Sequence, residues 1–116
     1  MRALIPSILL VLAACNDPLE CMEYAAFGVR AFLRDSVTNT AYTDSAVVVA
    51  HEGTFADTLL SVVDSVWVGV AERAGTYRLD VSASGYVNWS RTGIVVTQKD
   101  ECHVQTTDVT VRLARP

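Results

Sequence analysis

The feature that most constrains this chain is an alternation of apolar and polar residues that recurs along most of its length. In the segment GTYRLDVSASGY, for example, polar residues separate Tyr77, Leu79 and Val81. Because successive side chains of a β-strand point to opposite faces, a period of two predicts a strand with one buried face. No stretch keeps a helical spacing of apolar residues between helix caps, so the sequence predicts no helix.

The same pattern divides residues 25–116 into about seven strands separated by turn signals. FGVRAFLRD predicts an early strand with alternating faces, and TDVTVRL predicts a similar strand near the C-terminus. AVVVAHE is a continuous apolar run and predicts a central strand covered on both sides. Residues 54–73 are interrupted near Asp64 and predict two strands. The sequence therefore predicts an all-β fold, a single antiparallel β-sandwich.

The first 14 residues have the composition of a cleaved signal peptide. Arg2 provides a positive charge, residues 3–12 form a short apolar run, and two alanines follow. The run is too short to cross a bilayer, which needs about 20 residues. The motif LAAC, which ends at Cys15, resembles the lipobox of bacterial lipoproteins. A plain secretory signal and a buried apolar segment remain as alternatives.

The lipobox resemblance implies a location and a partner. Cys15 would become the first residue of the mature chain and carry acyl groups, so membrane lipid would be a partner through this residue. Residues 15–24 would then form a lipidated N-terminus and tether in front of a domain at 25–116. Asn16 favours the outer membrane of a bacterial envelope, where the domain would face the periplasm or the exterior. The formal net charge of −4 argues against nucleic acid as a partner.

The chain has three cysteines, so at least one thiol lies outside any intramolecular disulfide. Cys21 and Cys102 flank the predicted domain, and in an exported protein two such cysteines favour a disulfide bond. First and last strands are often neighbours in sandwiches, which makes a short separation plausible. Free buried thiols and metal ligation remain as alternatives.

The segment AGTYRLDVSASGYVNW resembles the signature of carboxypeptidase regulatory-like domains, which are transthyretin-like β-sandwiches. That signature typically reads G-x-Y-x-L-x-V-x-A-x-G-Y. The residues that match it are Gly75, Tyr77, Leu79, Val81, Ala83, Gly85 and Tyr86.

An upstream turn extends this resemblance. Asp35, Thr38 and Ala46 match the family's D-x-x-T-G turn and second strand, and Asn39 stands where glycine is usual. Asparagine tolerates the left-handed backbone that such a turn needs. The resemblance implies a folding or adhesion module without catalytic residues of its own.

The sequence contains few candidates for catalytic or metal-binding residues. No G-x-S-x-G elbow is present, and we expect neither an enzyme nor a cofactor. Metal binding lacks the usual ligand spacing, and it would require His51 and His103 to converge in space. The sequence thus predicts a structural or binding module of the envelope, with an envelope protein or glycan as a further partner. The alternative is a binder of small ligands, glycans or peptides that uses an exposed aromatic face. The candidate residues for that face are Trp89, Phe32 and Tyr86.

Overall fold

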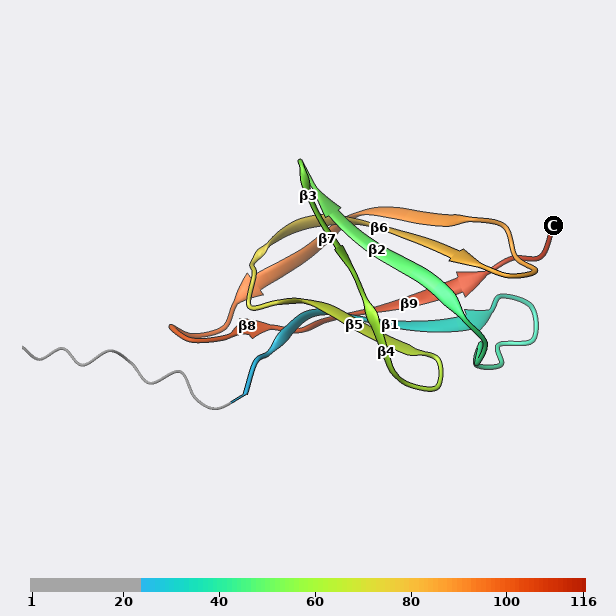
Figure 1. Ribbon diagram of the computed structural model, residues 1–116, viewed down its shortest axis with the longest axis horizontal. Helices are drawn as coiled ribbons and strands as arrows, with labels where there is room; N and C mark the ends of the chain where they lie inside the picture. The colour runs from blue at the N-terminus through green and yellow to red at the C-terminus, as the bar shows by residue number, and fades with distance from the viewer. Residues whose placement is uncertain (1–23) are drawn as a thin grey trace, which may run out of the picture.

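The structure is a computed structural model that describes residues 24–116, which form two β-sheets (Figure 1). The predicted signal peptide, Cys15 and Cys21 lie outside the described residues, as does nearly all of the tether. Within residues 24–116 there is no helix, and hence none long and apolar enough to cross a membrane. The strands are β1 (Phe27–Asp35), β2 (Ala46–Glu52), β3 (Phe55–Thr58), β4 (Leu60–Val63), β5 (Val66–Ala71), β6 (Gly75–Ala83), β7 (Trp89–Gln98), β8 (Val104–Gln105) and β9 (Thr107–Leu113).

The two sheets confirm the all-β prediction and correct one detail of it. One sheet has the strand order β4-β5-β1-β9, and the other has the order β3-β2-β6-β7-β8. Most neighbouring strands are antiparallel, but β1 and β9 run parallel. The expectation of a purely antiparallel fold is therefore wrong for this pair. An alternating pattern reports which face of a strand is buried, and it carries no information on the direction of the neighbouring strand.

Residues 54–73 form three strands where the sequence predicted two. Strand β3 pairs with β2 in one sheet, and β4 pairs with β5 in the other, so the chain crosses between sheets at Leu59. The Leu59 side chain is buried, and its backbone N–H donates to the Val48 carbonyl oxygen at 2.8 Å. Together with the two-residue strand β8, this crossing raises the number of strands in residues 24–116 from the expected seven or so to nine.

The core lies between the sheets and contains the residues that the alternation marked as inward. Leu33 and Leu79, from facing sheets, are both fully buried. The prediction for AVVVAHE is wrong, because β2 is covered on one face only. Val48 is buried, whereas Val47 is 55% exposed. Trp67 also belongs to the core, where it is 4% exposed.

Asp35 connects several segments at one end of the fold, where the C-terminus and the β1–β2 turn lie (Figure 1). Its carboxylate accepts hydrogen bonds from the backbone N–H groups of Val37 and Thr38, at 2.8 and 3.0 Å. The Tyr86 hydroxyl donates to it at 2.8 Å, and Arg115 forms an ion pair with it at 3.2 Å. These donors, led by Thr38 and Tyr86, hold the pKa of Asp35 far below its usual range.

Glu72 occupies the corresponding place at the opposite end, near β8 and the start of β1. Its carboxylate accepts hydrogen bonds from the backbone N–H groups of Ala26 and Val104, at 2.7 and 3.0 Å, and contacts His103 Nδ1 at 2.5 Å. The ring of Tyr24 stacks on His103 with 4.3 Å between the centroids. The hydrogen bonds from Ala26 and His103 lower the pKa of Glu72.

Candidate binding groove

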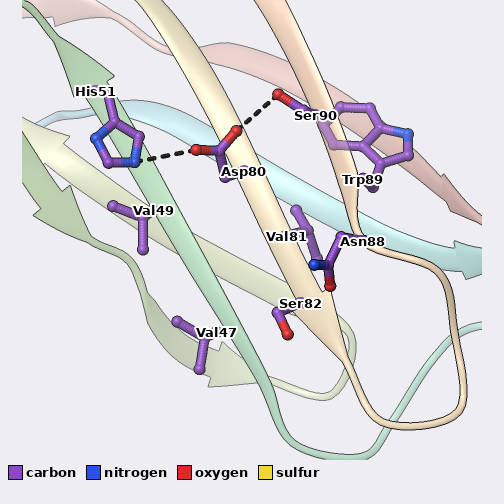
Figure 2. Close-up of a pocket in the computed structure, with 9 residues that line it drawn as sticks. All are labelled: Val47, Val49, His51, Asp80, Val81, Ser82, Asn88, Trp89 and Ser90. Atoms are coloured by element: carbon purple, nitrogen blue, oxygen red, sulfur yellow. Dashed lines mark hydrogen bonds and ion pairs between the residues drawn. The ribbon is translucent and has the colours of Figure 1, made fainter.

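A shallow groove crosses the outward face of the five-stranded sheet (Figure 2). It has a volume of about 420 Å³ and lies over the adjacent strands β2, β6 and β7. The residues that line it are Val47, Val49, His51, Asp80, Val81, Ser82, Asn88, Trp89 and Ser90.

The strand register explains why these residues meet. Val49 of β2 lies opposite Asp80 of β6, and Asp80 lies opposite Ser90 of β7. Residues two apart on a strand share a face, so Val47, Val49 and His51 form one column along β2. The outward side of β2 therefore supplies an apolar stretch that ends in a histidine.

Asp80 is the polar centre of the groove. Its carboxylate contacts His51 Nε2 at 3.1 Å and accepts a hydrogen bond from the Ser90 hydroxyl at 2.7 Å, as the dashed lines in Figure 2 show. The Arg78 guanidinium forms an ion pair with it at 3.1 Å. Partial burial acts to raise the pKa of Asp80, but the contacts with Ser90, Arg78 and His51 together lower it. Asp80 is thus held as a carboxylate.

The order of these three groups differs from that of a catalytic triad. In a serine hydrolase the histidine lies between the serine and the carboxylate and accepts the serine proton. Here the carboxylate lies between them, and the Ser90 hydroxyl donates to Asp80 rather than to His51. Nothing in this row activates Ser90 as a nucleophile. His51, Asp80 and Ser90 thus place hydrogen-bonding groups beside the exposed side chain of Val47. This combination of polar and apolar groups suits the binding of a ligand.

The three aromatic residues predicted to form a binding face lie in different places. Phe32 belongs to β1 in the four-stranded sheet, and the Arg30 guanidinium lies 5.6 Å from its ring centroid. Trp89 borders the groove from β7, but it is half-buried and packs against the core. Tyr86 is also half-buried and directs its hydroxyl toward Asp35. Phe32, Trp89 and Tyr86 therefore do not lie together on one face of the domain.

The two histidines of the metal hypothesis bind different carboxylates. His51 contacts Asp80, whereas His103 is buried against Glu72. Among residues 24–116 no group of three or more histidine, cysteine, aspartate or glutamate side chains could hold a metal ion.

Cys102 lies in the turn between β7 and β8, and its backbone N–H donates to the Asp100 side chain at 2.9 Å. Its predicted partner, Cys21, and the predicted lipidation site, Cys15, are outside the part of the chain that the structure describes. The neighbouring His103 stacks on Tyr24, so the beginning of the described chain runs beside this turn.

Asp80 is the polar residue between Leu79 and Val81, so the alternating pattern predicts that it lies on the outward face, but no motif marks it or Ser90 as a site residue. The sequence holds no motif for this contact, because Asp80 and Ser90 are ten residues apart. The two residues meet only through the register of β6 and β7. No protein-family model and no curated protein matches this chain.

Proposed function

We propose that this protein is a non-catalytic, lipid-anchored module of the bacterial envelope that binds a partner through the groove on its five-stranded sheet. The observation that carries the binding role is the row of His51, Asp80 and Ser90 beside the outward valines of β2, Val47 and Val49. The groove is shallow and open, and its Ser90 hydroxyl donates to the Asp80 carboxylate rather than to the histidine. The resemblance of AGTYRLDVSASGYVNW to carboxypeptidase regulatory-like domains supports the same role.

Site-specific photo-crosslinking tests the groove. A benzophenone amino acid is placed at Val47, inside the groove, or at Val95, on the same sheet but outside it. The two positions are matched because their side chains are 55% and 50% exposed. We expect a discrete covalent adduct in intact cells from position 47 and none from position 95. Equal labelling at both positions, or none at either, would contradict a binding role for the groove.

The anchor is proposed from the LAAC motif and tested separately. Mass spectrometry of the membrane fraction should show Cys15 as the N-terminal residue of the mature chain, carrying acyl groups. Substitution of Cys15 by Ser removes the thiol that accepts the lipid, so we expect the C15S variant to leave the membrane fraction. A mature chain that begins at another residue would refute the anchor and leave the groove proposal standing.

We also propose that a disulfide between Cys21 and Cys102 braces the domain beside the anchor. The stacking of Tyr24 on His103 supports it, because Tyr24 follows Cys21 by three residues and His103 follows Cys102 directly. Three residues span at most about 10 Å, so the chain can bring the two sulfur atoms together. In this arrangement Cys15 remains available for lipid, which accounts for the odd number of cysteines.

A further inference from the structure

Two arginines that form no ion pair within residues 24–116 face each other on the four-stranded sheet, the sheet that does not carry the groove. Arg34 of β1 lies directly opposite Arg112 of β9 in the parallel register. Both donate to the same atom, the side-chain oxygen of Asn39, from Arg34 Nε at 3.0 Å and from Arg112 Nη1 at 2.9 Å. Arg34 also donates to the Asn39 backbone oxygen at 2.7 Å. A single neutral side chain thus holds two guanidinium groups together.

No carboxylate in residues 24–116 neutralises this pair. The ion pairs of the described residues use Arg30, Arg73, Arg78 and Arg115, and they include neither Arg34 nor Arg112. Asp108 lies four positions before Arg112 on the same face, and it is already paired, because it accepts hydrogen bonds from Arg30 through both carboxylate oxygens, at 2.8 and 3.0 Å.

Like charges directly opposite each other on neighbouring strands destabilise a sheet. On the same face Asp108 balances Arg30, but no acid in residues 24–116 forms an ion pair with Arg34 or Arg112. Arg34 and Arg112 keep several N–H donors that no described residue accepts, and Arg112 is exposed. Paired guanidinium groups with free donors match the geometry of carboxylate and phosphate oxygens.

We infer that the Arg34–Arg112 pair is a binding site for an oxyanion, a carboxylate or phosphate group carried by a ligand. Asn39 positions the site, since its backbone has a φ of 62° and its side chain turns back over β1 and β9. The outward row next to the pair consists of Phe32 and Thr110. A ligand bound to the arginines therefore has a half-buried ring and a hydroxyl within reach. The site is independent of the proposed groove, which lies on the other sheet.

Titration followed by NMR of the arginine Nε–H signals tests this site, with the full chain in a non-ionic detergent. Inorganic phosphate and an oligouronate form the two anion arms, and a neutral oligosaccharide is the control. We expect saturable shifts of the Arg34 and Arg112 signals with at least one anion and none with the neutral sugar. A response to phosphate alone identifies a phosphate ligand, and a response to the oligouronate alone identifies a carboxylate ligand.

Three variants make the result specific. R112Q removes one guanidinium, and because Arg112 makes only one hydrogen bond to Asn39, we expect the fold to persist. Affinity for the anion should fall by about tenfold or more, the contribution of a charge-assisted hydrogen bond. R112K keeps the charge without the forked donors and should fall between R112Q and wild type. R91Q is the matched control, because Arg91 is exposed and also lacks an ion pair in the described chain.

Two results would overturn the inference. One is the absence of any shift at the pair with either anion up to about 50 mM, a concentration about fifty times a dissociation constant of 1 mM. The other is an equal loss of affinity in R112Q and R91Q, which would mean that the anion responds to overall charge and not to this pair. Far-ultraviolet circular dichroism of R112Q identifies a folding defect; if it unfolds, R112K and R91Q provide the same comparison.

Discussion

The two ends of this fold are each fastened by one carboxylate, and the two carboxylates work differently. Asp35 binds two N–H groups of its own turn, only two and three residues away, and its side chain is 5% exposed. The partners of Glu72 among residues 24–116 are all distant in sequence, namely Ala26, His103 and Val104, and its side chain is 29% exposed. One end is closed mainly by local structure, whereas the other depends on segments far apart in the sequence.

This difference indicates which contacts stabilise each end of the fold. A turn capped by its own aspartate forms with a small loss of chain entropy, and Tyr86 and Arg115 then attach to it. The Glu72 end must hold the start of the domain against the β7–β8 turn across a long loop. A covalent link between these distant segments would stabilise that end the most, and the proposed Cys21–Cys102 bond would lie there.

The largest expected effect comes from removing this bond. Substitution of Cys102 by Ser should lower the free energy of unfolding by about 2–5 kcal/mol, because the unfolded chain is released from an 81-residue loop. Denaturant titration measures the loss, and mass analysis of the alkylated, unreduced protein should show Cys21 and Cys102 protected. The Asp35 end should keep its contacts, so Tyr86 should retain its environment.

The control for this comparison is reduction. A reductant should destabilise the wild-type chain to the level of C102S and leave C102S itself unchanged. Alkylation of both cysteines in the oxidised protein would contradict the bridge, and so would a wild-type chain whose stability does not respond to the reductant.

The same contrast explains which parts of the fold could be predicted from the sequence. Alternation identified the buried faces of β1, β6 and β9, because the period of two follows from strand geometry alone. The turn that begins at Asp35 was also foreseen, and Asn39 has the left-handed backbone expected for it. Both features depend on residues a few positions apart.

Features that depend on distant partners could not be predicted. Glu72 lies in the short segment AER, which has no local motif, and its donors lie more than thirty residues away. The parallel pairing of β1 with β9 and the contact of Ser90 with Asp80 likewise depend on strand order and register. The apolar run of β2 suggested burial on both sides, but its outward valines instead line the groove.

Acid unfolding compares the two carboxylates directly. The expected change in stability is smaller than that from removing the disulfide bond. The folded-state pKa of Asp35 and that of Glu72 are both lowered, so each group stabilises the fold above its unfolded pKa, about 4, and loses this contribution as pH falls further. Replacement by the neutral amide removes that dependence. We therefore expect the stability of D35N and of E72Q to fall less steeply than that of wild type below about pH 4.

The change should be greater for D35N than for E72Q. Asp35 is the more buried side chain and has four donors, including the Tyr86 hydroxyl and the Arg115 guanidinium, so its charged form gains more from folding. Thermal unfolding of wild type, D35N, E72Q and D80N between about pH 2 and 7 measures how steeply the stability of each falls with pH. D80N is a matched control, because the pKa of Asp80 is also lowered but its side chain is 37% exposed. An equal flattening in all three variants would mean that the acid response reflects general charge repulsion and that the two ends are not distinguished by their carboxylates.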